Sequence, residues 1–213
     1  MRLSLTHHTR FDYAHIVTLS HQLVRLTPRS FERQHLLEYS LSINPAPERI
    51  EARPDAFGNE VREILIRSPH DELRIESRAL VDVFDPPHIM LDLSPPWDEA
   101  ARALNHPRSV AALEAAQFAY PSPHVDIQGA AQFAADLFVP GTPLLRIANN
   151  LSRRIFQQFE YQGGVTDVFT PVPHVMSAMR GVCQDFAHVA IARLRAAGLA
   201  ARYVSGYLVT QPT

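Results

Sequence analysis

The first third of the chain alternates hydrophobic and polar residues with a period of two. In residues 35–43 (HLLEYSLSI) the hydrophobic side chains fall on one face, and a glutamate and two serines fall on the other. Residues 72–84 (ELRIESRALVDVF) repeat this pattern with charged residues on the second face. Such alternation predicts strands with one face in solvent. The two hydrophobic faces consist of Leu37, Tyr39, Leu41 and Ile43, and of Leu73, Ile75, Ala79, Val81 and Val83.

Other segments of this region are also strand candidates, and the residues between strands favour turns. Pro, Asp, Asn and Gly are concentrated in NPAPE (44–48) and PDAFGNE (54–60), where they indicate turns rather than helices. Several short strands at this spacing predict an antiparallel β-sandwich-like domain over residues 1–84. The additional strands are expected over 2–13, 19–28 and 60–68.

The pattern changes after residue 84. Residues 85–96 (DPPHIMLDLSPP) contain four prolines and predict an extended linker. Beyond them, hydrophobic residues recur every three or four positions, which indicates helices packed on a core. We therefore expect an α+β chain whose second domain, 97–213, is mainly helical. The expected helices cover 97–105, 109–119, 127–138 and 142–161, the last with Thr142 as N-cap and Pro143 at its first position, followed by a short turn over 170–181.

The single cysteine lies at the start of a further predicted helix. Residues 182–198 read as one helix of roughly fifteen residues that ends at Gly198, where a left-handed cap is expected. We expect Cys183 to share the hydrophobic face of this helix, with Arg193 and Arg195 pointing away from it. Residues 199–208 (LAARYVSGYL) predict a strand, so the helix is expected to pack against a sheet.

The first turn of a helix is a favourable place for a nucleophilic thiol. Its N–H groups lack intrahelical partners, and the helix dipole adds partial positive charge, so a thiolate is stabilised there. The N–H of Cys183 also points where an oxyanion would form. Gln184 and Asp185 belong to the same turn, and the charge of Asp185 would partly oppose a thiolate close to it. A lone cysteine on a hydrophobic helix face is, however, more often a small buried residue, and these arguments alone leave both interpretations open.

Composition narrows the class of protein. Hydrophobic residues make up 46% of the 213 residues, charged residues 20%, and the net charge is −2, so no electrostatic argument favours nucleic acid or an anionic membrane as partner. One cysteine excludes an intrachain disulfide. The N-terminus lacks the hydrophobic core of a signal peptide, and no segment has the length of a membrane span. We expect a cytoplasmic protein.

The cysteine segment resembles a known family. Residues 181–188 (GVCQDFAH), the Arg-x-x-Gly of 195–198 and residues 201–207 (ARYVSGY) are similar to the core motif of the bacterial transglutaminase-like superfamily, whose members resemble papain-type thiol enzymes. Residues 7–29 and 55–61 are similar to the β domain that precedes this core. The resemblance implies a papain/transglutaminase-like core of helices packed on an antiparallel sheet.

The resemblance also implies a chemistry. In such enzymes the cysteine attacks an amide carbonyl and forms a thioester, a histidine acts as base and then acid, and an aspartate orients that histidine. By this resemblance Cys183 is the nucleophile, the substrate is a protein or peptide, no cofactor is needed, and amide hydrolysis by a protease or amidase is favoured.

The family's histidine and aspartate follow the cysteine in sequence and are absent here. Only His188 lies between Cys183 and Thr213, and it is about 140° around the helix from the cysteine. His188 and His174 are both expected to have structural roles. The core therefore reads as truncated, and the chain is either a fragment of a longer protein or a short relative that has lost catalysis. We expect it to be inactive alone, and its unpaired sheet edge to be covered by dimerisation, strand exchange or a partner.

A metal-binding protein and a protein-interaction module are the alternatives to an enzyme. His7 and His8 are neighbours on a predicted strand and point to opposite faces, and the remaining histidines have no partners at metal-site spacing, so no metal site is expected. A non-catalytic protein-interaction module with a degenerate core stays open as the alternative to an enzyme.

Overall fold

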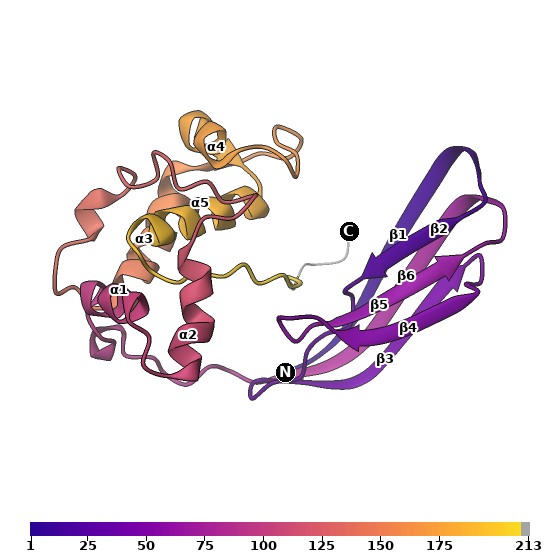
Figure 1. Ribbon diagram of the computed structural model, residues 1–213, viewed down its shortest axis with the longest axis horizontal. Helices are drawn as coiled ribbons and strands as arrows, with labels where there is room; N and C mark the ends of the chain where they lie inside the picture. Colours follow the sequence, from indigo (N-terminus) through magenta and orange to yellow (C-terminus); the bar gives the residue numbers. More distant parts are fainter. Residues whose placement is uncertain (210–213) are drawn as a thin grey trace. The chain divides into compact units, whose positions relative to one another are not determined.

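The computed structural model describes residues 1–209, and these form two compact units (Figure 1). The first unit comprises Met1–Ile89 and the second begins at Met90. The first unit contains strands and the second mainly helices, which confirms the predicted α+β class. Each unit is described by itself below.

The first unit consists of two three-stranded antiparallel sheets, ordered β1-β6-β3 and β2-β5-β4. Residues of β5 and β6 pack together in one hydrophobic core, as expected of a sandwich: Ile64 and Ile66 contribute from one sheet, Leu73 and Ile75 from the other. The strands are β1 (Arg2–Val17), β2 (Ser20–Val24), β3 (Gln34–Asn44), β4 (Arg49–Pro54), β5 (Glu60–Ile66) and β6 (His70–Val83).

Two details of this unit differ from the prediction. The register of β3 against β6 shifts between Leu36 and Glu38. The shift places Leu36 in a half-buried position and leaves Leu37 exposed, so Leu37 does not belong to the inner face as predicted. Strand β4 was missed because it is only six residues long, lies between the two segments rich in turn residues, and has no buried face.

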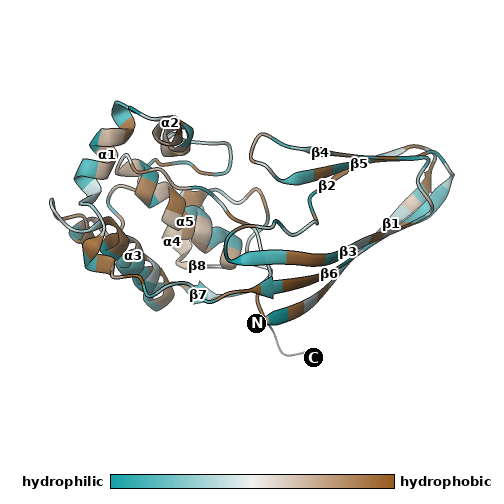
Figure 2. Ribbon diagram, turned by 90° about the horizontal axis from the view of Figure 1, so that it is seen from below, coloured by the Kyte–Doolittle hydropathy of each residue, from teal (hydrophilic) through white to brown (hydrophobic). Residues whose placement is uncertain are grey.

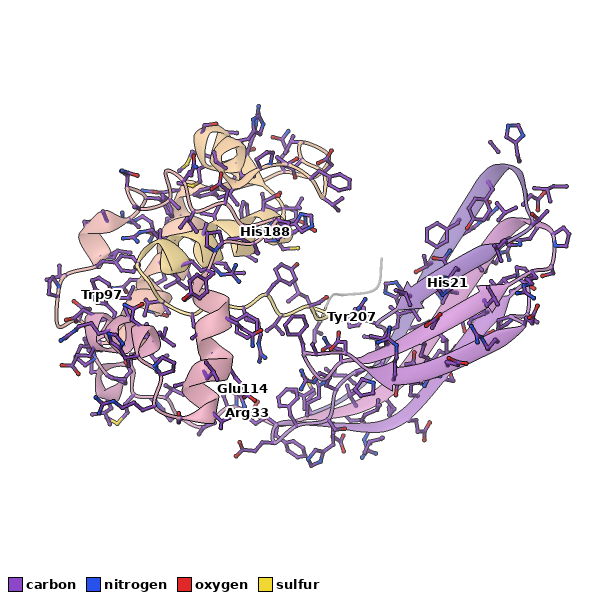
Figure 3. The ribbon with its side chains drawn as sticks, viewed as in Figure 1. His21, Arg33, Trp97, Glu114, His188 and Tyr207 are labelled. Atoms are coloured by element: carbon purple, nitrogen blue, oxygen red, sulfur yellow. The ribbon has the colours of Figure 1, made fainter. Side chains whose placement is uncertain are left out.

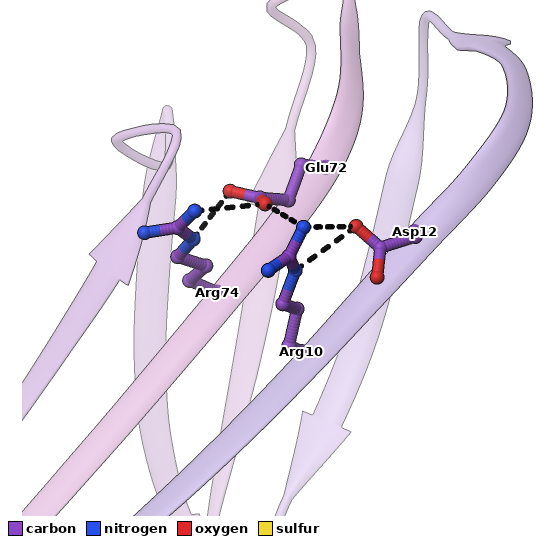
Figure 4. A network of polar contacts seen from close by, with 4 residues as sticks. All are labelled: Arg10, Asp12, Glu72 and Arg74. Carbon is purple, nitrogen blue, oxygen red and sulfur yellow. Dashed lines mark hydrogen bonds and ion pairs between the residues drawn. The ribbon is translucent and has the colours of Figure 1, made fainter.

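The outer face of β1 and β6 carries paired charges (Figure 4). Arg10 binds Asp12 at 2.7 Å and Glu72 at 2.8 Å, and Glu72 in turn binds Arg74. Along β6, Glu72 and Arg74 alternate with the buried residues Leu73 and Ile75. The alternation seen in the sequence is therefore the alternation between this charged surface and the core.

The second unit contains short helices around a core formed mainly by α3 and α5. Ile147, Leu151 and Ile155 of α3 are buried, as the spacing of its hydrophobic residues predicted, and brown and teal segments alternate along α3 in Figure 2. A pair of two-residue parallel strands, β7 (Glu160–Tyr161) and β8 (Arg180–Gly181), lies before α5. The helices are η1 (Leu91–Leu93), α1 (Trp97–Asn105), α2 (Val110–Ala116), η2 (Gln117–Ala119), η3 (Ala135–Leu137), α3 (Leu144–Gln158), α4 (Val172–Ala178) and α5 (Cys183–Ala196).

Three predictions about the helices before α4 were wrong. Residues 127–138 form turns and the short helix η3 instead of one helix, because Gly129 and Ala134 both have positive φ and interrupt it. The N-cap of α3 is Pro143 rather than Thr142. The helix predicted over 142–161 was too long, since α3 ends at Gln158, whereas the segment predicted over 109–119 forms α2 followed directly by η2.

Residues 199–208 do not form the predicted strand. They are irregular, because a strand exists only where a neighbouring strand accepts its hydrogen bonds, and no ladder reaches these residues within the described part of the chain. Ala201 is instead held by a hydrogen bond from its N–H to the carbonyl of Phe118. Residues 210–213, the end of the predicted core, lie outside the described residues.

Candidate active site

The site is built around the first turn of α5. The chain enters this helix from β8, which β7 holds in place: Gln162 donates its N–H to the carbonyl of Gly181 at 2.9 Å. Val182 has an extended backbone and is the N-cap, and Cys183 is the first residue of the helix. The side chain of Cys183 is exposed. The structure therefore contradicts the prediction that Cys183 packs on the hydrophobic face, and with it the interpretation of a buried spacer.

The first turn presents open N–H groups beside the sulfur. The first helical hydrogen bond runs from the N–H of Phe186 to the carbonyl of Val182, at 3.1 Å. Among residues 1–209 no acceptor bonds the N–H groups of Cys183 and Gln184. These donors and the helix dipole favour negative charge at this end of α5. An exposed thiol at the first position is therefore placed where a thiolate, or the oxyanion of an attacked carbonyl, is stabilised.

Asp185 belongs to the first turn of α5, and its side chain caps the start of the helix. Only 1% of its surface is exposed, and its Oδ2 accepts the N–H of Val182 at 2.8 Å and the hydroxyl of Thr166 at 2.6 Å. Gly181 passes close to the same oxygen, which a Cβ at that position would approach to 2.5 Å. Gln184, also predicted to support this turn, is half-buried, and the described residues give its side chain no hydrogen bond.

Two arginines of α5 are buried, although the sequence pattern predicted only that they point away from the hydrophobic face of the helix. Arg193 donates to the carbonyl of Phe133 at 2.6 Å and lies 3.5 Å over the ring of Phe138. Arg195 reaches the backbone on both sides of the helix: it donates to the carbonyls of Tyr120 and Ala201 and to the hydroxyl of Ser122. Their exposed fractions are 4% and 8%. Both therefore fix loops against α5, the helix that carries Cys183.

His188 lies on α5, five residues after Cys183, and packs within a group of rings (Figure 3). Its imidazole stacks on that of His124, with 6.3 Å between the ring centroids and 11° between the planes, and the ring of Tyr203 lies 5.5 Å away. Burial, and to a lesser extent the nearby His124, lower the pKa of His188, while Asp185 acts in the opposite direction. No hydrogen bond joins the thiol of Cys183 to His188 or His174 in the described part of the chain. The expected structural roles of both histidines stay predictions.

Other candidate sites receive no support from the described residues. Residues 1–209 contain no group of three or more His, Cys, Asp or Glu side chains that would hold a metal ion. An open hollow of about 330 Å³ lies between α2 and residues 200–202, and its lining, which includes Glu114 and Arg202, does not include Cys183. Within the same residues no helix has both the length and the hydrophobicity needed to cross a membrane. Among the described residues, the exposed thiol of Cys183 is therefore the candidate reactive group.

Sequence comparison finds two family models and long matches to mycobacterial proteins. The model of the bacterial transglutaminase-like N-terminal region matches residues 3–82, and that of the transglutaminase-like superfamily core matches residues 131–213. Uncharacterized proteins of Mycobacterium bovis and Mycobacterium tuberculosis are 40% identical over 99% of this chain, which spans 67% of their length. A protein of Mycobacterium leprae is 29% identical over 97% of the chain and is covered to 71%.

A structural comparison agrees with the two matched family models at the level of the fold. The crystal structure of a proposed cysteine protease from Cytophaga hutchinsonii matches with a TM-score of 0.70 and 20% identity, over 92% of this chain and 63% of the other. The present chain thus spans less than two thirds of that protein. The N-terminal sandwich, the helix that begins at Cys183 and the two matched family models together show that this chain belongs to the bacterial transglutaminase-like family.

Proposed function

We propose that this chain carries the nucleophile of a cysteine enzyme that acts on amide bonds of proteins or peptides. The proposal rests on the exposure of Cys183 at the first position of α5, beside two N–H groups that have no acceptor in the described part of the chain. Membership of the transglutaminase-like family supports it. Hydrolysis, as in a protease or amidase, is the reaction we favour, with no metal or cofactor taking part.

The proposed reaction has two halves. The thiolate of Cys183 attacks the carbonyl carbon, a C–S bond forms, and the charge moves to the oxygen, where the N–H of Cys183 stabilises it. The C–N bond then breaks, the amine leaves with a proton from a general acid, and a thioester remains. Water attacks the thioester, the acid is released, and the thiol is restored.

The proton transfers need a base that the described residues do not place at the sulfur. His188 is packed against His124 and Tyr203 and makes no hydrogen bond to Cys183. We therefore propose that this chain alone does not turn over amides, that it forms an acyl-enzyme only with esters whose leaving group needs no acid, and that the base and its orienting carboxylate are supplied by residues other than those described.

An activated ester tests this proposal because it does not need an acid to expel its leaving group. With a peptidyl p-nitrophenyl ester we expect a burst of about one equivalent of p-nitrophenolate and a matching acyl adduct on Cys183 by intact mass, followed by slow release. The Cys183→Ala variant should show neither. Absence of an adduct on the folded protein would contradict the role of Cys183. Rapid multiple turnover would contradict the proposal that this chain alone supplies no base to the sulfur.

The second candidate is a non-catalytic interaction module, which is favoured by the absence of a base at Cys183 among residues 1–209. It predicts that the folded chain reacts with the ester no faster than the chain unfolded in urea. The same experiment, run in both conditions, separates the two functions.

A further inference from the structure

The loop before α4 meets the start of α5 at one buried oxygen atom. Thr166 lies 19 residues before Asp185 and donates its hydroxyl to Asp185 Oδ2 at 2.6 Å. The same oxygen accepts the N–H of Val182 at 2.8 Å. Asp185 is 99% buried and lies two residues after Cys183. Thr166 is thus tied to the turn that carries the thiol, although it is distant in sequence.

The loop holds Thr166 independently of this contact. Asp167 accepts the N–H of Phe169 at 2.9 Å and the hydroxyl of Thr170 at 3.0 Å, and the hydroxyl oxygen of Thr170 accepts the N–H of Asp167. On the other side of the carboxylate, Gly181 leaves no space for Oδ2 to move toward the backbone, since a Cβ would lie 2.5 Å from it. The hydroxyl of Thr166 and the backbone at residues 181–182 therefore enclose this oxygen from two sides.

The same first-turn N–H groups can stabilise both the Asp185 carboxylate and a thiolate at Cys183. The position of the carboxylate therefore affects the thiolate. The N–H groups of Cys183 and Gln184 have no acceptor among residues 1–209, while Asp185 uses the N–H of Val182. A carboxylate that lost its contact with Thr166 would be free to turn toward those N–H groups, and a thiolate at Cys183 would then compete with it.

We propose that Thr166 is a positioning residue for the Cys183 thiolate, whose hydroxyl holds the Asp185 carboxylate at the N–H of Val182 and so leaves the first-turn N–H groups of α5 to the sulfur and the oxyanion. This inference rests on the proposed role of Cys183 as nucleophile. It adds a residue of the 163–170 loop to the site, acting through Asp185 rather than on the substrate.

Alkylation of the single cysteine with an anionic and a neutral reagent tests this role. The ratio of the rates with iodoacetate and iodoacetamide reports the electrostatic environment of the sulfur, because the anion is favoured by the open N–H groups. For Thr166→Val we expect this ratio to fall about two- to fivefold, the range of helix-terminus electrostatics. Thr166→Ser keeps the hydroxyl and should restore the wild-type ratio, and Thr6→Val, at an exposed position of β1, should leave it unchanged.

The outcomes separate this inference from the proposed function. A merely structural role for Thr166 would lower the melting temperature of the valine variant but leave the reagent ratio of its folded form unchanged, and that result would overturn the inference. If Cys183 of the folded wild-type protein is alkylated no faster than in the protein unfolded in urea, the proposed function is contradicted, and the inference that rests on it is contradicted too. Should Thr166→Val not fold, hydrogen exchange of the wild type decides: the N–H of Val182 should exchange more slowly than those of Cys183 and Gln184, and the reverse order would overturn the inference.

Discussion

At the scale of single residues, the geometry around Asp185 explains why Gly181 precedes the cysteine. The close approach of Oδ2 to the backbone at residue 181 requires the absence of a side chain there. This contact also fixes the N-cap at Val182, and with it the register at which α5 begins.

The Gly181→Ala substitution should therefore destabilise the protein by about 1–3 kcal/mol, because either the carboxylate or the backbone must move to admit the Cβ. The free energy of unfolding from urea titrations measures this effect. Gly163→Ala is the matched control, since a Cβ at Gly163 meets no atom within 4 Å. Equal stability of the two variants would contradict the tight approach seen at Gly181.

His188 should make stability depend on pH. Its folded pKa is lowered, mainly by burial, so as pH falls below about 6.5 the unfolded chain takes up the proton first and folding becomes less favourable. His188→Gln should reduce the loss of stability between pH 7.5 and pH 5, as measured by urea unfolding at both values. The exposed His15→Gln serves as control. An unchanged pH dependence in His188→Gln would show that His188 is not held neutral by its surroundings.

The sequence predicted part of the site and missed the rest for a physical reason. Placing Cys183 at a helix start needed only local signals, namely Gly181 before it and a hydrophobic run after it. The contact from Thr166 depends on how a distant loop packs, and no local pattern encodes it. The exposure of Cys183 was also missed, because the side chain of the first turn that faces inward is that of Asp185, which hydrophobic spacing does not identify as buried.

At the scale of elements, α5 is held by its arginines as well as by its hydrophobic side chains. Arg195 joins the helix to the segments at 120–122 and 201, where it satisfies the carbonyls of Tyr120 and Ala201. The helical period predicted only that Arg193 and Arg195 point away from the hydrophobic face, and it gave no sign that they are buried. The carbonyl groups that make burial acceptable come from other parts of the chain and are invisible to the helical period.

Replacing Arg195 by Met should cost about 2–3 kcal/mol, because the carbonyls of Tyr120 and Ala201 lose a charged hydrogen-bond donor that is itself buried. Arg153→Met, at an exposed position of α3, should change the free energy of unfolding by less than about 0.5 kcal/mol. Urea unfolding of both variants gives the comparison. A loss at Arg195 no larger than at Arg153 would contradict the bridging role.

Strand β6 provides a similar test in the first unit. The exposed ion pairs of Glu72 should contribute little, so Glu72→Gln is expected to cost less than about 1 kcal/mol. Its neighbour Leu73 is fully buried, and Leu73→Ala should cost about 2–5 kcal/mol. Thermal and urea unfolding measure both changes. A larger cost for Glu72→Gln than for Leu73→Ala would mean that the charged face, not the core, stabilises this sheet.

Most strands and helices were predictable because each has a hydrophobic face of regular period. The failures occurred where the backbone departs from regularity. The register shift near Leu36 moves side chains between faces, and positive φ at Gly129 and Ala134 interrupts a segment of helical composition. Residues 199–208 have strand-like composition, but strand formation depends on a pairing partner, which their own sequence does not reveal.

At the scale of the whole molecule, hydrophobic side chains accumulate toward the end of the described chain. Val204 and Leu208 are 77% and 83% exposed, and Tyr203, Tyr207 and Val209 are also exposed. Contiguous exposed hydrophobic residues promote association. The self-association expected from the sequence therefore stays a prediction with structural motivation.

We expect light scattering after size exclusion to show a dimer whose fraction rises with concentration. A double substitution, Val204→Lys with Leu208→Lys, should shift the equilibrium toward the monomer because it places charge in the hydrophobic segment. Val110→Lys with Leu113→Lys, on the exposed surface of α2, is the matched control. A stable monomer of the wild type at all concentrations would contradict the expectation.

The activation of Cys183 by the start of α5 is the central claim, and the alkylation rate of this cysteine tests it most directly. With one cysteine in the chain, iodoacetamide labelling followed by intact mass spectrometry reports that residue alone. At pH 6.5 the folded protein should react faster than the same protein unfolded in urea, because folding supplies the N–H groups and the dipole that stabilise the thiolate. An equal or slower rate in the folded protein would show that the helix start does not activate the thiol.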